Sequence, residues 1–336
     1  MLLDRIGMHV PIIQAPMAGV TTPALAAAVA NAGGLGSLGV AAQDAERAGK
    51  DIRQVRALTG QRFNVNVFCH RPPRRDAAKE QAWLDGLAPD FARFGADRPE
   101  ALSDGYRPFA DDPDMLAMLL AEKPGVVSFH FGLPPDDQIA ALRDSGAILL
   151  GSATCRADAE KARAAGLDGI VAQGWQAGGH RGVTDTDAQD ERLETLDLLA
   201  ALKDIGLPLI AAGGIMTRED VRTVLAAGAV AAQCGTAFLV ADEAGTSPAH
   251  RAALASGRTR MTRAISGRPA RGVENVISSR DGSAAPDYPL PYSALKALHA
   301  VASAAGENGY GPFWAGTGCA NARQGTAAEI VGRLAP

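Results

Sequence analysis

The sequence lacks three features that would place it in a special class of protein. Its cysteines, Cys69, Cys155, Cys234 and Cys319, include no C-x-x-C pair, so neither a zinc site nor a disulfide framework is expected. No apolar run approaches the roughly 18 residues of a membrane span, and the N-terminus MLLDRIGMHVP carries charges too early for a signal peptide. We therefore expect a cytoplasmic protein without a metal and without a membrane partner.

Aromatic residues and excess positive charge are also scarce. Aromatics make up 5% of the chain and the net charge is −4, so nothing suggests the basic face that nucleic acid would require. By contrast, 47% of the residues are hydrophobic and 38 are glycine. A chain of 336 residues with this composition can form a barrel of about 250 residues plus an appendage.

Short apolar runs alternate with helical patterns along the chain. The predicted strands are PIIQAP (11–16), LGSLGV (35–40), FNVNVF (63–68), VVSFHF (126–131), AILLGS (147–152), GIVAQG (169–174), LPLIAAGG (207–214) and VAAQCGT (230–236). Segments with helical spacing, such as TPALAAAVANAG and TREDVRTVLAAG, separate most of them. Eight such units predict an α/β fold, a (β/α)8 TIM barrel rather than an open doubly wound sheet.

Two regions exceed a minimal barrel. We expect residues 1–70 and 125–240 to form the barrel. The insertion 71–124 and the C-terminal region 241–336 would then pack together over one mouth as a smaller, mainly helical cap domain.

One literal motif is set aside. GLGSLG (34–39) matches G-x-G-x-x-G, but a dinucleotide fingerprint needs a strand before it and a helix directly after it. Here a helical pattern precedes the run, which itself is predicted to be a strand.

Glycines at the ends of the last two strands suggest a phosphate site. In TIM barrels, phosphate is often held after strands seven and eight, where Gly213 and Gly214, and Gly235 with Thr236, stand in this sequence. The exposed N–H groups of such turns can bind a dianion without lysine. The alternative is that these glycines only form tight turns.

Histidines supply the candidate acid/base groups. His180 follows strand six in AQGWQAGGHRG, where small residues allow a close backbone approach to a ligand; Arg181 is more consistent with a structural charge. His130, at the end of strand four, could line a pocket or pack in the core. The remaining histidines, His9, His70, His250 and His299, are expected to be solvated or structural. The C-terminal aromatics could cap the cavity or pack between domains; they are Tyr288, Tyr292, Tyr310, Phe313 and Trp314.

Several motifs together resemble one family. QAPMAGVTTP (14–23), FNVNVF, VSFHFGLP (127–134), AQGWQAGGHRG (172–182), AAGGI (211–215) and FWAG (313–316) occur in order and resemble the nitronate monooxygenases, formerly 2-nitropropane dioxygenases, of the bacterial class I branch. The resemblance implies an FMN-dependent enzyme that oxidises alkyl nitronates, such as propionate 3-nitronate, with O2 to a carbonyl compound and nitrite. Detoxification is a role that this chemistry suggests.

The resemblance also assigns residues. His180 matches the family's active-site histidine. The cofactor contacts would be Met17, Asn66, Gln173, Gly178, Gly179, Gly213, Gly214, Gln233, Cys234, Gly235 and Thr236. We expect His130, Tyr292 and Tyr310 in the substrate pocket. Thr317 stands where the family more often has glutamine, which leaves the role of that segment open.

Two roles for His180 remain open at this point. An imidazole near the flavin could orient the nitronate anion, or it could take the α-proton of a neutral nitroalkane. Two other functions also remain: an NAD(P)H-dependent flavin reductase acting on quinones or enoyl thioesters, and a non-catalytic flavin-binding protein. The protein is expected to be a monomer or a homodimer.

Overall fold

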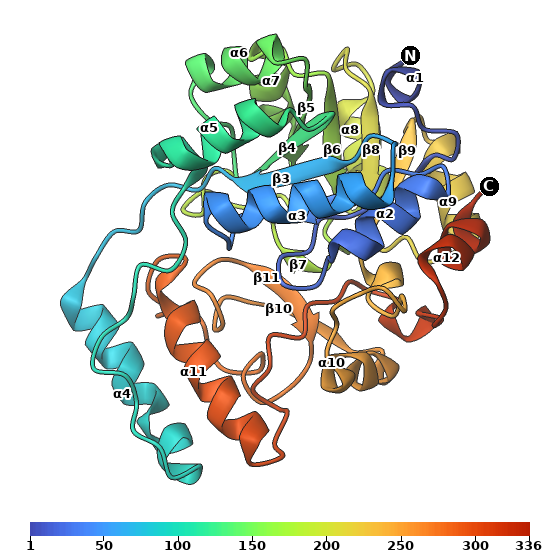
Figure 1. Ribbon diagram of the computed structural model, residues 1–336. Coiled ribbons are helices and arrows are strands. Elements are labelled where there is room, and N and C mark those ends of the chain that lie inside the picture. The colour runs from blue at the N-terminus through green and yellow to red at the C-terminus, as the bar shows by residue number, and fades with distance from the viewer.

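The computed structural model describes residues 1–336, and its centre is a parallel eight-stranded sheet that closes on itself (Figure 1). The strand order is β1-β9-β8-β6-β5-β4-β3-β2, and a parallel bridge between Ile13 and Leu35 joins the first strand to the last. The strands are β1 (Ile12–Gln14), β2 (Ser37–Gly39), β3 (Asn64–Phe68), β4 (Val126–His130), β5 (Ile148–Ala153), β6 (Gly169–Gln173), β8 (Leu209–Ala212) and β9 (Ala231–Cys234). The predicted TIM barrel is confirmed, with all eight predicted strands in place.

Helices separate the strands and cover the outside of the barrel (Figure 1). Several of them begin at side-chain caps: Asp44 accepts a hydrogen bond from the backbone N–H of Arg47, and Thr217 forms a capping box with Asp220. The helices are α1 (Leu2–Ile6), α2 (Pro23–Asn31), α3 (Ala45–Leu58), α4 (Ala77–Arg93), α5 (Pro113–Glu122), α6 (Asp136–Asp144), α7 (Arg156–Ala164), α8 (Thr195–Leu202), α9 (Arg218–Ala226), α10 (Pro248–Ala253), α11 (Leu290–Ala304) and α12 (Ala327–Leu334), with 3-10 turns at Phe109–Asp111, Thr236–Phe238, Leu254–Ser256 and Cys319–Asn321.

Two apolar layers stabilise the barrel. A cluster of 49 buried residues fills the space between strands and helices, and a second cluster inside the barrel includes Leu2 and Ile6 of α1. Helix α1 therefore closes one end of the barrel, which leaves the opposite end, where the strands terminate, for a ligand.

The glycines of GLGSLG have a packing role. A Cβ at Gly36 would lie 1.9 Å from the carbonyl oxygen of Ala26, and one at Gly34 would lie 2.6 Å from that of Ile12. These glycines let α2 approach the barrel, and β2 occupies the end of the motif. The structure thus agrees with setting aside the dinucleotide interpretation.

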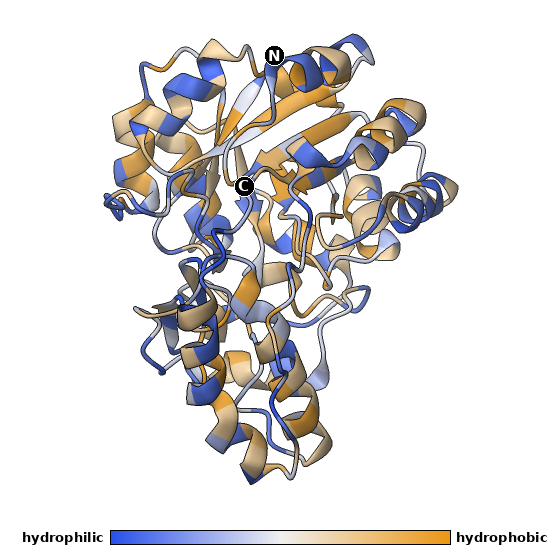
Figure 2. Ribbon diagram, turned by 90° about the vertical axis from the view of Figure 1, so that its left-hand side faces the viewer, coloured by the Kyte–Doolittle hydropathy of each residue, from blue (hydrophilic) through white to orange (hydrophobic).

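A smaller lobe lies below the barrel in Figure 1, where α4 of the insertion packs against α11 of the C-terminal region. Their shared core includes Trp83, Leu87, Leu295 and Leu298. Figure 2 shows the mixed polar and apolar character of these helices beside the more uniformly apolar barrel strands.

The expected domain boundaries need two corrections. Phe109 and α5 pack in the barrel core, because α5 is the helix that connects β3 to β4. Helix α12 also packs on the barrel, against α2 and α9. Both segments belong to the barrel rather than to the cap.

The C-terminal region is also less helical than expected. Strands β10 (Thr259–Thr262) and β11 (Ala270–Val273) form a hairpin, and β11 pairs with the two-residue strand β7 (Gly179–His180). Helical spacing did not reveal these short strands, whose pairing joins segments about ninety residues apart. None of the helices is both long enough and apolar enough to cross a bilayer.

Candidate active site

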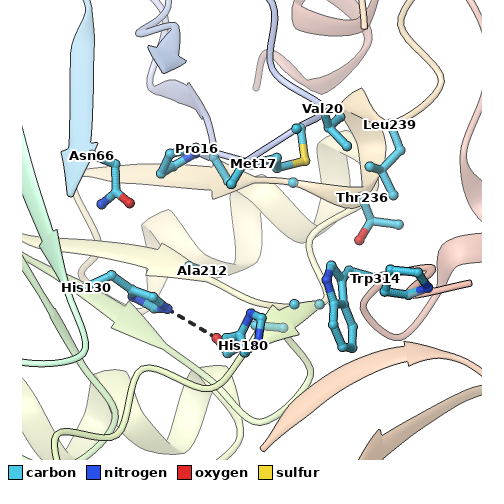
Figure 3. Close-up of a pocket in the computed structure, with 18 of the residues that line it drawn as sticks. Pro16, Met17, Val20, Asn66, His130, His180, Ala212, Thr236, Leu239 and Trp314 are labelled. Atoms are coloured by element: carbon cyan, nitrogen blue, oxygen red, sulfur yellow. Dashed lines mark hydrogen bonds between the residues drawn. The ribbon is translucent and has the colours of Figure 1, made fainter. Parts of the chain in front are cut away.

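A cavity of about 460 Å³ opens at the carboxyl ends of the barrel strands, where TIM-barrel enzymes hold their ligands. Every predicted cofactor contact lines it: Met17, Asn66, Gln173, Gly178, Gly179, Gly213, Gly214, Gln233, Cys234, Gly235 and Thr236. Figure 3 shows Asn66, Pro16 and Met17 along one side of this space and His130, His180 and Trp314 along the other.

The ends of β8 and β9 present bare backbone to the cavity. Gly213 and Gly214 have φ values of +122° and +73°, which glycine adopts without strain. The backbone N–H groups of Gly214, Gly235 and Thr236 donate to no protein acceptor. Because buried N–H groups are nearly always paired, these free donors beside a cavity fit an anionic group such as a phosphate.

The C-terminal segment completes this part of the cavity. Gly316 donates its N–H to Thr236 Oγ1 at 2.9 Å, and Thr317 donates its N–H to the carbonyl oxygen of Gln176 at 3.0 Å. A Cβ at Gly178 would lie 2.4 Å from the nitrogen of Gly316, so glycine is needed where the two segments cross. Thr317 lines the cavity beside Gly214, which shows where the residue that departs from the family pattern lies.

His180 is held by its neighbours through its backbone. Its carbonyl oxygen accepts hydrogen bonds from Gln173 Nε2 at 3.0 Å and from His130 Nε2 at 3.2 Å. His130 in turn contacts Ser152 Oγ through Nδ1 at 2.8 Å. His130 therefore lines the cavity and also positions β7 (Figure 3).

The imidazole of His180 has a single polar partner. Its Nε2 lies 2.9 Å from Ser266 Oγ, and the same hydroxyl lies 3.3 Å from the carbonyl oxygen of Arg268. If Ser266 donates its hydroxyl hydrogen to the carbonyl oxygen of Arg268, Nε2 of His180 carries the ring proton and Nδ1 is an acceptor. If Ser266 donates to Nε2 instead, Nδ1 carries the ring proton and is a donor.

His180 is neutral at ordinary pH. Burial, followed by the positive charge of Arg268, lowers its pKa from 6.5 to about 3. Rings surround it at centroid distances of 5.1 Å (Trp314), 5.4 Å (Tyr288) and 5.8 Å (Phe131). No carboxylate lies near enough to restore the charged form.

The mouth of the cavity includes two residues, Tyr106 and Lys296, that the sequence analysis did not identify. Lys296 donates from Nζ to the hydroxyl of Tyr106 at 2.6 Å, and it is the only charged residue among those lining the cavity. Tyr292, Lys296 and His299 are spaced i, i+4, i+7 on α11, a pattern that could have predicted one shared face. Ser266 and Arg268, in a loop, left no such signal.

Three expectations about individual residues are corrected. Tyr310 does not line the cavity: it is buried in the core of the small lobe, where its hydroxyl donates to Asp90 at 3.0 Å. His250 and His299, expected to be solvated or structural, both line the cavity. Of the two roles left open for the C-terminal aromatics, Tyr288, Phe313 and Trp314 have the first, because they line the cavity as well.

A TIM barrel with a glycine-lined cavity and a neutral histidine at the carboxyl ends of its strands fits the class of TIM-barrel enzymes that bind their ligands at this rim. The sequence profile of the family "Nitronate monooxygenase" matches residues 1–336. The chain belongs to this family of oxidoreductases.

Two named relatives support this assignment. A nitronate monooxygenase of Paraburkholderia phytofirmans is 54% identical, with 99% of this chain and 93% of the relative covered. A nitronate monooxygenase of Pseudomonas aeruginosa is 48% identical, with 98% of this chain and 96% of the relative covered.

Solved structures agree with the fold. A nitroalkane oxidase from Streptomyces ansochromogenes superposes with a TM-score of 0.91 at 40% identity, covering 99% of this chain and 96% of that one. FabK from Thermotoga maritima has a TM-score of 0.75 at 24% identity, covering 99% and 94%, and shares the fold. The family and the first of these structures support nitronate oxidation as the activity.

Proposed function

We propose that the protein is an FMN-dependent enzyme that oxidises alkyl nitronates, such as propionate 3-nitronate, with O2 to a carbonyl compound and nitrite. Atoms and charge balance when two nitronate anions and one O2 give two carbonyl compounds and two nitrite ions. The names of the relatives support the substrate class.

The cavity's charge is the observation that carries the proposal. None of the lining residues is aspartate or glutamate, although the chain contains 37 of them. Lysine, free N–H groups and a neutral imidazole face the ligand instead. Such a site favours an anion over a neutral or cationic ligand.

The residues present fit FMN. The free N–H groups of Gly214, Gly235 and Thr236 would hold its phosphate, and Asn66, Met17 and His180 would flank its ring. A bound flavin would supply the electron-transfer chemistry that amino-acid side chains lack. With one phosphate cradle at hand, FMN fits better than FAD, and mass spectrometry of the released cofactor tests this choice.

Of the two roles expected for His180, the geometry supports orientation of a preformed nitronate. A group whose conjugate acid has a pKa of about 3 is a poor acceptor for a carbon-bound proton, because proton transfer needs matched pKa values. As a donor, Nδ1–H can bind the nitro oxygens, where the negative charge of a nitronate resides. Ser266 permits this tautomer by donating to Nε2.

An anaerobic titration tests the proposed function. Propionate 3-nitronate should bleach the visible absorbance of the protein-bound flavin, whereas NADH and NADPH should leave it unchanged. Bleaching by a pyridine nucleotide but not by the nitronate would identify a reductase. A flavin that none of these compounds reduces would identify a binding protein without turnover.

A further inference from the structure

Arg268 is a buried cation without a counter-ion. It is 3% exposed, no carboxylate forms an ion pair with it, and its Nε has no hydrogen-bond acceptor. The guanidinium donates a single hydrogen bond, from Nη2 to the carbonyl oxygen of Val183 at 2.7 Å. Burial lowers its pKa to about 10, so it still carries a positive charge at neutral pH. Burying a charge that forms no ion pair is costly, and the rings of Phe131 and Tyr288, whose centres lie 4.1 and 5.8 Å from Cζ, offset only part of that cost.

Arg181 provides the contrast. It is equally buried and follows His180 directly in the chain, but its Nε and Nη2 bond both oxygens of Asp190 at 2.9 and 3.0 Å. The charge of Arg181 is therefore compensated. Arg268 has no such ion pair, since Asp158 acts on its charge only from a distance, although both guanidinium groups act on His130.

The Arg268 guanidinium lies behind the histidine wall of the cavity. Its Cζ is 4.1 Å from the ring centre of Phe131, and that ring meets the imidazole of His180 edge-on, with centroids 5.8 Å apart. Phe131 has a φ of +74°, a conformation that costs a non-glycine residue roughly 1 kcal/mol or more. This backbone places the Phe131 ring in contact with both the cation and the imidazole, and the ring of Tyr288 also lies near both.

The loop that carries Arg268 is rigidly placed. Ser266 contacts the imidazole of His180. Gly267, which lies between Ser266 and Arg268 in the chain, has a φ of +86°. A Cβ at Gly267 would lie 2.2 Å from the carbonyl oxygen of Pro286, so glycine is needed where this loop packs directly against the backbone of Pro286. The position of the buried charge relative to the cavity is therefore set by the fold.

No negative side chain of the cavity wall opposes this charge. The only other cation facing the space is Lys296, which lies at the mouth and is exposed. Salt screens exposed charges over about 8–10 Å but screens buried ones much less. At an effective dielectric constant near 20, a unit charge about 10 Å away changes anion affinity on the order of tenfold.

We propose that Arg268 is a specificity-determining residue, whose uncompensated buried charge makes the cavity prefer an anionic substrate over a neutral molecule of the same shape. The inference rests on the proposed function in that the anion it selects is the nitronate, and the molecule it rejects is the parent nitroalkane. Arg268 acts electrostatically across the Phe131 ring and does not line the cavity, so it contacts neither the nitronate nor the nitroalkane.

Binding of two inert probes tests this assignment without turnover. Propionate has the planar, two-oxygen anionic group of a nitronate, and propionamide is its neutral isostere. Isothermal titration at pH 7.5 of the protein as purified should give a Kd for propionate at least tenfold below that for propionamide. In Arg268→Met the Kd for propionate should rise about tenfold while that for propionamide changes less than twofold. Arg268→Lys, which keeps the charge, should retain most of the preference.

Controls separate Arg268 from the other cations. Arg258→Met removes an exposed arginine from the start of the same hairpin and should leave both Kd values unchanged. In 0.5 M KCl the preference should persist, because the Arg268 charge is buried. A preference that disappears in salt or in Lys296→Met, and survives in Arg268→Met, would overturn the proposal.

Two further outcomes would also overturn the proposed role of Arg268. Equal weakening of both probes in Arg268→Met would mean that Arg268 only supports packing. If that variant does not fold, a wild-type protein without an anion preference overturns the proposal by itself. Failure of nitronate to reduce the bound flavin would refute the proposed function and leave the charge preference intact, so the two failures are distinguishable.

Discussion

The two sides of the cavity are built differently. The cofactor side, at the ends of β8 and β9, offers backbone N–H groups and glycines from two neighbouring strands. The side proposed to bind the substrate offers side chains from β4, β7 and α11, which are far apart in the sequence, and the 266–268 loop supports His180 from behind. A backbone cradle tolerates little change in the chain that forms it, whereas a side-chain wall can be altered residue by residue. Substitutions on the two sides should therefore fail in different ways.

The largest effect is expected on the cofactor side. Gly214→Leu should abolish flavin binding, because Leu is strained at a φ of +73° and its side chain would crowd Gln176 and Thr317. The absorbance of the purified protein near 450 nm measures the bound flavin. Gly206→Leu is the matched control, since Gly206 also has a positive φ, of +81°, but lies outside the cavity. Full flavin occupancy in Gly214→Leu would remove the phosphate site from this position.

Acid should destabilise the substrate side. Burial lowers the pKa to about 3 for His180 and to about 4 for His70, His130 and His250, from about 6.5 in the unfolded chain. Below pH ~6.5 these histidines therefore bind protons in the unfolded state but not in the folded state. The free energy of unfolding consequently falls as the pH drops towards about 4. Summed over four histidines, the loss in free energy of unfolding is on the order of several kcal/mol.

Urea unfolding at pH 7.5, 6 and 5 measures this loss. His250→Asn should give a shallower pH dependence, and substitution of the exposed His9 by Asn should leave the slope as in the wild type. A free energy of unfolding that is constant over this range would mean that the histidines are not buried in their neutral form.

A smaller, purely functional effect is expected at His180. His180→Asn keeps some hydrogen bonding but loses the fixed donor, and a hydrogen bond to a charged group is worth about 1.5–3 kcal/mol. The kcat/KM for propionate 3-nitronate should fall roughly 10- to 100-fold. Flavin content should stay at the wild-type level, in contrast to Gly214→Leu. An unchanged kcat/KM would exclude His180 from substrate orientation.

The smallest effect tests the corrected position of Tyr310. Tyr310→Phe removes only the hydrogen bond to Asp90 in the small lobe and should cost about 1 kcal/mol of stability. Its KM for the nitronate should match the wild type, whereas Tyr292→Ala, at the cavity, should raise KM. A raised KM in Tyr310→Phe would show that the small lobe communicates with the substrate side.

The sequence predicted the fold, and it predicted which glycines lie at the rim of the barrel and line the cavity. Eight apolar runs with helices between them are sufficient for the barrel, because each unit follows from local periodicity. Gly213, Gly214 and Gly235 could be assigned because a barrel strand places the residue after its end at one known rim. The three short strands β7, β10 and β11 were missed, since their residues, GH, TRMT and ARGV, form no apolar run.

The substrate side was predicted only in part. His130, His180 and Tyr292 were identified, but Tyr310 was misplaced, because aromatic composition does not show to which core a ring belongs. Tyr106 of the insertion and Lys296 of α11 meet across 190 residues, and neither carries a local motif. Contacts of this kind depend on how two lobes pack.

By itself the sequence determined the succession of strands and helices along the barrel, the glycines at the ends of the last two strands, and the position of one histidine after the sixth strand. These are local properties, set by the period of apolar residues and by backbone freedom at glycine. Only the tertiary structure decided that His180 is neutral, because its pKa depends on burial and on the charge of a residue 88 positions away, Arg268. It also decided that Arg181 is paired and Arg268 is not. Charge compensation depends on distances through space, which the order of residues along a chain does not contain.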